Sequence, residues 1–382
     1  MVRSTIAITV LALAAAAAAQ QGRYRDVVFA RANVQPDVAY GQAVNRFTQQ
    51  TETLELDLYT PRGDTATARA AIVLVHGGGF VGGDKGSQQW RTLGDDFARR
   101  GYVAISINYR LVPSGSATPQ AITDASHDMK AAVRWLRRNA STLRLDPQRI
   151  GCLGGSAGAI TCAETAYVPG EGSSGNPGFS SEVGAVIDLW GLLADLTQLE
   201  AGEAPVQIIH GTDDPTVLYQ NALDLKARAD AVGVPAELFP IQGAGHGPWG
   251  AYFGQYHVEA VGFLYHHLGL GQLAGLQARP GYASPGRLTL DSFGIAGDSY
   301  AIMVAAAQTS APVPGFGTLC LDPLSGLVVA TAGTLPSAPR LATASRSMAV
   351  PPGVVGDAYW QAFHLESAAS GRWLTNCVTT TF

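Results

Sequence analysis

A serine enclosed by glycines is the residue of this sequence with the clearest capacity for chemistry. The segment reads Gly154-Gly155-Ser156-Ala157-Gly158, after a short apolar run. In a sharp turn from a strand into a helix, the hydroxyl of Ser156 is exposed, and the backbone N–H of Ala157 points into the same space. The pattern therefore predicts a nucleophile and one donor of an oxyanion hole. Because the chain has 45 glycines, a plain flexible turn is the alternative, and the context must decide.

A second glycine-rich loop lies upstream and strengthens this prediction. It reads His76-Gly77-Gly78-Gly79-Phe80 and follows a continuous β-branched run over residues 70–75. Glycines let a main chain approach a ligand closely and present its N–H groups. We expect Gly78 and Gly79 to supply the other donors of the oxyanion hole, because two loops of this kind build one hole together.

A serine hydroxyl becomes an effective nucleophile only when a base accepts its proton. His246 is the preferred base because glycines surround it in a loop that follows the last expected strand, residues 236–239. The other histidines have simpler interpretations. His76 and His210 are expected to form hydrogen bonds within their loops, and His364 belongs to the C-terminal segment. The remaining four lie on expected helices: His127, His257, His266 and His267. Three large aromatic residues flank the loops and are candidate pocket walls, although such residues more often belong to the core: Phe80, Trp190 and Trp249.

The elements that must position these residues alternate between strands and helices. Apolar patterning predicts strands at 54–59, 70–75, 103–110, 149–153 and 206–210, and helices at 89–100 and 121–140. This order is typical of an open, mainly parallel sheet with helices on both faces, in which ligands bind at the carboxyl ends of the strands. The predicted fold class is therefore α/β, with Ser156 at the carboxyl end of a central strand.

Four segments together resemble the α/β-hydrolase carboxylesterases of the bacterial feruloyl-esterase-like and hormone-sensitive-lipase-like groups. The segments are 76–80, 108–111, 128–136 and 154–158, and the resemblance covers residues 54 to 268. It departs from the family at Gly155, where an acidic or bulky residue often precedes the serine, and at Ala159, where a second glycine often follows.

The resemblance also selects the acid. In the family, the acid is the aspartate just before a proline, which corresponds to Asp214 in the segment 211–217. Asp213 is the main rival, and Asp188 is a more distant one. Capping of the helix that begins near Pro215 is an alternative role for Asp214, and the two roles are compatible.

The two ends of the chain differ from this central part. Arg3, an apolar run and Ala17-Ala18-Ala19 are typical of a secretory signal peptide at residues 1–19, so we expect a secreted or periplasmic protein. Residues 24–270 are expected to form the catalytic domain and residues 271–286 a linker. Short alternating runs over 287–382 predict a small all-β, sandwich-like domain that contacts a carbohydrate or a surface, or simply packs against the catalytic domain.

Composition excludes several other classes of protein. The net charge of −5 offers no basic surface for nucleic acid, and no apolar stretch after the signal peptide is long enough to span a membrane. The four cysteines favour a Cys320–Cys377 disulfide, whereas Cys152 and Cys162 fit either a disulfide or two buried thiols. No Cys-x-x-Cys pattern suggests zinc or redox chemistry.

These observations predict an exported serine carboxylesterase that needs no metal or cofactor and acts on small-molecule or polysaccharide-linked esters. The acyl group is expected to be acetyl, feruloyl or short-chain. A prolyl-oligopeptidase-like peptidase would use the same residues, but the chain lacks a large upstream propeller domain. A binding protein with an inactive hydrolase domain is the alternative from another class.

Overall fold

The computed structural model describes residues 23–115 and 119–270, and the backbone of the strands that lie between residues 275 and 381. The expected signal peptide, residues 1–19, lies outside the described residues. The chain divides into two compact units, Met1–Leu270 and Gly271–Phe382, and each is described by itself.

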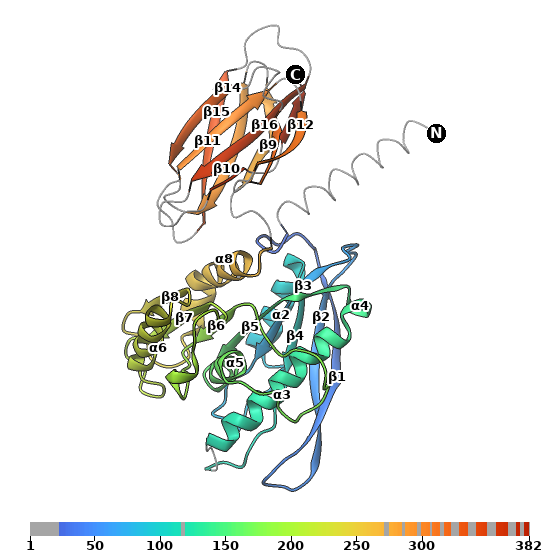
Figure 1. The fold of residues 1–382 in the computed structure, drawn as a ribbon, viewed down its shortest axis with the longest axis vertical. Coiled ribbons are helices and arrows are strands. Elements are labelled where there is room, and N and C mark those ends of the chain that lie inside the picture. Colours follow the sequence, from blue (N-terminus) through green and yellow to red (C-terminus); the bar gives the residue numbers. More distant parts are fainter. Residues whose placement is uncertain are drawn as a thin grey trace. The chain divides into compact units, whose positions relative to one another are not determined.

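An eight-stranded sheet forms the centre of the first unit (Figure 1). Its strand order is β1-β2-β4-β3-β5-β6-β7-β8, and only the β1–β2 and β2–β4 pairs are antiparallel. The predicted mainly parallel sheet is thus confirmed. The strands have these bounds: β1 Ala32–Val44, β2 Thr51–Pro61, β3 Arg69–Val75, β4 Val103–Ile107, β5 Leu145–Gly155, β6 Val186–Leu189, β7 Val206–Gly211 and β8 Ala236–Ile241.

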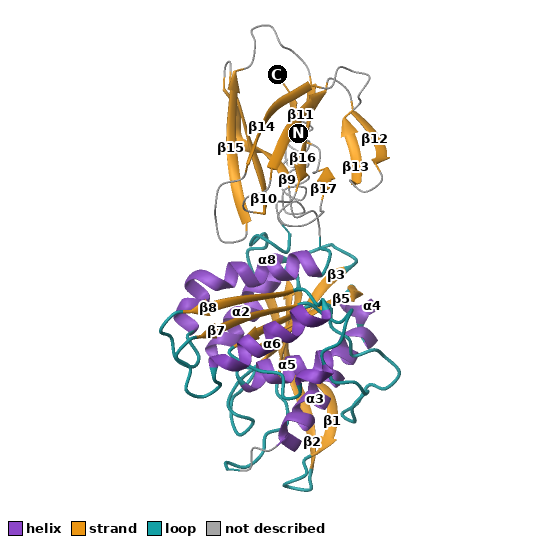
Figure 2. Ribbon diagram, turned by 60° about the vertical axis from the view of Figure 1, so that its left-hand side comes forward, coloured by secondary structure: helices purple, strands orange, loops and turns teal. Residues whose placement is uncertain are grey.

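Helices cover both faces of this sheet (Figure 2). Their bounds are α2 Gln88–Arg100, α3 Pro119–Arg138, α4 Ala140–Leu143, α5 Ala157–Tyr167, α6 Tyr219–Val232, α7 Trp249–Ala251 and α8 His257–His267, with a 3₁₀ turn at Leu196–Gln198 and a π-helical turn at Tyr252–Tyr256. Successive residues of β5 show the two faces: a Cβ at Gly151 would contact Leu264 of α8, whereas Cys152 faces Cys162 of α5. None of the helices within the described residues is both long and apolar enough to cross a membrane.

Local sequence explains the central elements. Every residue of β3 is buried because this strand lies between two parallel neighbours, as its continuous apolar run predicts. Helix α2 ends at Gly101, whose φ of 105° is left-handed. There the N–H groups of Gly101 and Tyr102 bond the carbonyls of Ala98 and Phe97, which is a Schellman cap.

The sequence patterns missed β1 and made one strand too long. Strand β1 contains Pro36 and Asp37, and its pairing with β2 is interrupted twice, so its residues do not alternate regularly. Strand β4 ends at Ile107 rather than at residue 110. Residues 108–110 leave the sheet because their polar groups make tertiary hydrogen bonds, described below.

The cysteines of the first unit are free thiols. Cys152 on β5 and Cys162 on α5 are both buried and unbridged. The expected Cys320–Cys377 pair lies outside the described side chains. Burial raises the pKa of the Cys162 thiol well above its ordinary value, and the nearby Cys152 raises it further, so this thiol stays protonated.

The second unit contains antiparallel strands only, among those described. They form the sheets β15-β10-β9 and β14-β11-β16-β17, with β18 on β16, and the pair β12-β13. The bounds are β9 Gly275–Ser284, β10 Arg287–Ile295, β11 Ser299–Ala305, β12 Gln308–Val313, β13 Gly317–Leu321, β14 Val328–Thr334, β15 Leu341–Ala349, β16 Asp357–Leu365, β17 Arg372–Leu374 and β18 Val378–Thr381.

The segment expected to be a linker, residues 271–286, contains strand β9, which corrects that expectation. Pro280 and Gly281 are typical turn residues, but they lie where the β9–β10 register shifts. The shift falls between the pairs Leu290–Ala278 and Leu288–Ala283. A bulge tolerates a proline because the ladder hydrogen bond is already interrupted there.

Candidate active site

Ser156 occupies a sharp turn between β5 and α5. Its backbone has φ 54° and ψ −122°, a left-handed conformation that residues with a Cβ rarely adopt. The turn is held at its centre because the N–H of Ser156 donates to the carbonyl of Leu189, the last residue of β6, at 2.9 Å. The serine thus lies at the carboxyl end of a strand in the middle of the sheet.

The two glycines around this serine are required by close backbone contacts. A Cβ at Gly154 would lie 2.2 Å from the carbonyl oxygen of Gly158, and one at Gly158 would lie 2.0 Å from the carbonyl oxygen of Val75. The start of α5 is therefore pressed against the end of β3 at a distance that no side chain allows.

A row of two hydrogen bonds joins Ser156, His246 and Asp214. The Nε2 atom of His246 lies 2.8 Å from the Oγ atom of Ser156, and its Nδ1 atom lies 2.7 Å from Oδ2 of Asp214. An ionised carboxylate only accepts, so Nδ1 carries the proton and Nε2 is left to accept one from the serine. The structure thus brings together the three residues that the sequence selected from distant segments.

Asp214 is held in its ionised form. Its side chain is buried, which alone would raise its pKa, but hydrogen bonds from His246 and from the N–H groups of Thr216 and Val217 outweigh burial and lower the pKa below its ordinary value. The two N–H groups donate to Oδ1 at 2.8 and 3.0 Å, which leaves Oδ2 for the histidine.

The rival carboxylates lie outside this row. Asp213 is exposed and accepts a hydrogen bond from its neighbour Thr212. Asp188 is fully buried at the end of β6, where its Oδ1 accepts the N–H of Gly191 at 2.6 Å.

The triple-glycine loop lies directly against the serine turn. A Cβ at Gly77 would be 2.7 Å from the carbonyl oxygen of Gly155 and 3.2 Å from the Cβ of Ser156. Gly78 and Gly79 have φ values of 126° and 61°, so the loop folds back in conformations that favour glycine. Gly78, Gly79 and Ser156 line the same cavity, which is described below.

Asn108 and Tyr109 bond the segment between β3 and α2, which contains this loop, and this explains why they leave strand β4. The side chain of Asn108 accepts the N–H of Lys85 at 2.7 Å and donates to Asp84 at 3.0 Å. The hydroxyl of Tyr109 donates to the carbonyl of His76 at 3.0 Å.

Arg110, the next residue of this segment, forms a buried ion pair with Asp128 of α3. The backbone N–H of Arg110 also donates to this carboxylate, at 2.8 Å. The segment after β4 is thereby fixed both to the glycine loop and to a helix on one face of the sheet.

A cavity of about 390 Å³ opens beside Ser156 and His246. One part of its wall is aromatic and another part is polar, and the lining side chains are Trp90, Trp190 and Trp249, and Asp84, Ser87, Gln89 and Thr216. Trp190 and Trp249 thus line it as the sequence suggested.

Phe80 does not line this cavity, which corrects its assignment as a pocket wall. Its φ of 64° turns the chain, and the side chain is buried in the core, with its ring centroid 6.1 Å from that of Tyr109. The position of Phe80 next to a glycine loop suggested a pocket residue, whereas the positive φ of Phe80 turns its side chain into the core.

The three tryptophans form an enclosure around Gly155. The ring of Trp249 packs edge-on against Trp90 at 5.4 Å and against Trp190 at 5.0 Å. A Cβ at Gly155 would have all three rings at 3.5 Å. Trp90 was missed in the sequence because its spacing in α2 indicates only a buried helix face, and the polar wall residues carry no distinguishing pattern.

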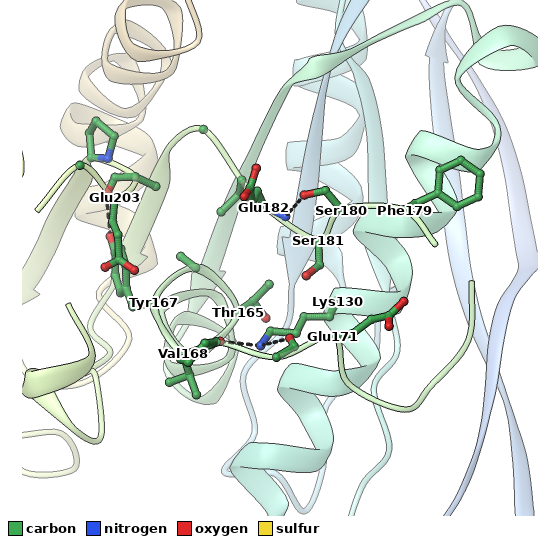
Figure 3. A pocket seen from close by; sticks show the side chains of 18 residues that line it. Lys130, Thr165, Tyr167, Val168, Glu171, Phe179, Ser180, Ser181, Glu182 and Glu203 are labelled. Carbon is green, nitrogen blue, oxygen red and sulfur yellow. Dashed lines mark hydrogen bonds between the residues drawn. The ribbon is translucent and has the colours of Figure 1, made fainter. Parts of the chain in front are cut away.

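A second cavity, of about 750 Å³, lies at the far end of α5 (Figure 3). Lys130 lines it, and the ammonium group donates to the carbonyls of Val168 at 2.6 Å and of Gly170 at 3.0 Å. This cavity contains none of the three residues of the hydrogen-bonded row. We therefore assign the chemistry to the smaller cavity, where a nucleophile, a base and an acid meet.

Across residues 23–115 and 119–270, no group of three or more His, Cys, Asp or Glu side chains is arranged to hold a metal ion.

Hydrolases and esterases are among the known proteins to which the chain is similar. The family model BD-FAE matches residues 56–204. The chain is 38% identical over 118 residues to phenmedipham hydrolase of Pseudarthrobacter oxydans and 36% identical over 115 residues to ethyl acetate hydrolase of Pseudomonas putida. These matches cover 30% and 29% of this chain, but only 23% and 33% of the two relatives.

A solved structure matches over a longer range. It is a thermophilic esterase of the planctomycete Thermogutta terrifontis with propionate bound, at 30% identity and a TM-score of 0.50. The match covers 56% of this chain and 85% of that protein.

The contact between Gly158 and Val75 predicts that Gly158→Ala destabilises the first unit. The added methyl group has only backbone atoms as neighbours, so we expect the free energy of unfolding to fall by about 1–3 kcal/mol. Gly254→Ala is the matched control because it lies in a helical turn with nothing within 4 Å of the added Cβ. Urea unfolding of the full chain measures both, and equal stabilities of the two variants would contradict the close contact.

Proposed function

The chain belongs to the α/β-hydrolase carboxylesterases, and we propose on that basis that it hydrolyses carboxylic esters through an acyl-enzyme on Ser156. The observation that carries the proposal is the row of hydrogen bonds, 2.8 Å from Ser156 to His246 and 2.7 Å from His246 to Asp214. It supplies a nucleophile, a base in the correct tautomer and an ionised acid at one cavity.

In the first half of the reaction, the Oγ atom of Ser156 attacks the ester carbonyl carbon while Nε2 of His246 takes the hydroxyl proton. The charge on the resulting imidazolium is balanced by Asp214. The carbonyl oxygen becomes an oxyanion, which the N–H groups of Gly78, Gly79 and Ala157 stabilise; one such donor contributes about a hundredfold or more in rate.

The tetrahedral intermediate then collapses. The bond between the carbonyl carbon and the alcohol oxygen breaks, and His246 returns its proton to that oxygen, so the alcohol leaves and the acyl group stays on Ser156. In the second half, a water molecule loses a proton to His246 and attacks the acyl carbon. Ser156 then recovers the proton as the carboxylic acid leaves.

We propose a small-molecule ester as substrate, with the acyl group in the tryptophan enclosure and the alcohol against the polar wall. A cavity of about 390 Å³ is in the range of small-ligand sites. The name of the Pseudomonas putida relative, an ethyl acetate hydrolase, supports a small acyl group. The proposal extends to acetylated and feruloylated polysaccharides, in which the sugar is a larger alcohol and the feruloyl group is a larger acyl group.

We also propose export and a carbohydrate or surface contact for the second unit. Export rests on the pattern of residues 1–19, and sequencing of the mature N-terminus tests it, with Gln20 as the expected first residue. The contact rests on the antiparallel strands of the second unit, and a pull-down of residues 271–382 on insoluble xylan and cellulose tests it.

Ser156→Ala removes the nucleophile, so we expect turnover of p-nitrophenyl acetate to fall to the residual rate that the oxyanion hole alone provides. In the wild type, a fluorophosphonate probe should label Ser156, as peptide mass spectrometry can verify. A folded wild type that is neither labelled nor active would favour a binding protein. Turnover of peptides but not esters would favour a peptidase.

Asp214→Asn should lower kcat by about 10⁴-fold, because an amide cannot hold the histidine in the tautomer that accepts the serine proton. Asp213→Asn is its matched neighbour and should retain kcat within about twofold, since Asp213 is exposed and outside the row. Steady-state kinetics on the same ester compare them. A larger loss of kcat in the Asp213 variant than in the Asp214 variant would show that Asp213 is the acid.

Gly155→Ala should shorten the preferred acyl chain, because the new methyl group enters the enclosure of Trp90, Trp190 and Trp249. We expect kcat/KM to fall at least about tenfold for hexanoate and at most about threefold for acetate, since each methylene in a pocket changes selectivity by roughly 10–200-fold. Gly250→Ala is the control, with nothing within 4 Å of its added Cβ. An equal loss at all p-nitrophenyl ester lengths would place the acyl group elsewhere.

A further inference from the structure

A second histidine contacts the carboxylate of Asp214. His210 is the penultimate residue of β7 and is fully buried. Its Nε2 atom lies 2.8 Å from the carbonyl oxygen of Val217 and 3.3 Å from Oδ2 of Asp214. A carbonyl oxygen only accepts hydrogen bonds, so the contact to Val217 requires the proton to be on Nε2.

The oxygen that His210 approaches is the one that matters for the proposed reaction. Oδ2 of Asp214 accepts the Nδ1–H of His246 at 2.7 Å, so two imidazoles face a single carboxylate oxygen. The other oxygen is held by N–H groups of Thr216 and Val217, which belong to the same loop as the aspartate. His210 therefore contacts this carboxylate from β7 and bonds the same loop at Val217, in addition to the backbone hydrogen bonds from Thr212 and Asp214 to the ends of β8 and β7.

Only one ring nitrogen of His210 is hydrogen-bonded within the described residues. Nδ1 is buried and has no hydrogen-bond partner among the described residues. Here the side chain leaves one nitrogen unpaired and aims the other at the acid loop.

The neighbouring strand adds negative charge on the same side. Asp188 of β6 pairs in register with Ile208, and side chains alternate along a strand, so Asp188 and His210 lie on one face of the sheet. Burial raises the pKa of Asp188 above its ordinary value, while the nearby His210 opposes that rise. The ring of Tyr219 closes the other side of His210, edge-on at 5.9 Å.

We propose that His210 is a positioning residue for the reaction, which directs Oδ2 of Asp214 toward His246 by holding both the carboxylate and the carbonyl of Val217. It acts through Asp214, because it is buried and does not line the cavity beside Ser156. This inference rests on the proposed esterase function.

The test compares His210→Leu, which removes the N–H, with His210→Gln, whose amide can restore a donor near Nε2. We expect His210→Leu to lower kcat on p-nitrophenyl acetate by about 10- to 100-fold with KM within about twofold, since small displacements of a catalytic group cost rates of this size. His210→Gln should recover most of the loss. His127→Gln, at a histidine that bonds exposed Ser173 and lies outside the proposed site, is the control and should match the wild type.

A double-mutant cycle separates positioning from general destabilisation. In the Asp214→Asn background, His210→Leu should lower kcat by less than about threefold, because the carboxylate that it positions is already gone. Full additivity of the two losses, or a folded His210→Leu enzyme with wild-type kcat, would overturn the proposal. If His210→Leu does not fold, His210→Gln and His210→Asn take its place in the cycle. A wild-type kcat in both of these variants would then overturn the proposal.

The failure of this inference is distinguishable from failure of the proposed function. If the wild type shows no fluorophosphonate labelling at Ser156, the esterase proposal fails. If labelling is complete but the His210 variants are fully active, only the positioning role fails.

Discussion

The left-handed backbone at Ser156 is the constraint on which the site depends. A side chain at φ 54° costs on the order of 1–3 kcal/mol, and it persists only because the surrounding structure leaves no alternative. The surroundings here are backbone atoms: the carbonyl of Val75 beside Gly158 and the carbonyl of Leu189 bonded to the N–H of Ser156. Three adjacent parallel strands, β3, β5 and β6, thus fix the serine before any side chain contributes.

The other functional groups reach the serine from the same edge of the sheet. Parallel strands all end at one edge, so loops distant in sequence converge there without a long connection. The acid loop follows β7 and the histidine loop follows β8, while residues 108–110 after β4 hold the glycine loop in place. The segment 108–110 therefore anchors a neighbouring loop and a helix.

Sequence reasoning succeeded where one local rule dominates and failed where tertiary contacts decide. The buried run of β3, the end of α2 at residue 100 and the glycines around Ser156 each follow from local chemistry, and the structure has them as predicted. The direction of Phe80 depends on the sign of one dihedral angle, which the residue type does not reveal. Strand β1 is irregular, and Trp90 reads only as a helix face, so neither could be recognised from periodicity.

The two thiols between β5 and α5 have a practical consequence. Cys152 and Cys162 are wholly enclosed, and they sit in the same layer that supports the serine turn. An alkylating reagent can reach them only when the sheet and α5 separate, so the rate of their modification records how often this layer opens. Mass spectrometry of the alkylated protein therefore measures local unfolding beneath Ser156 through cysteines that the natural sequence already contains.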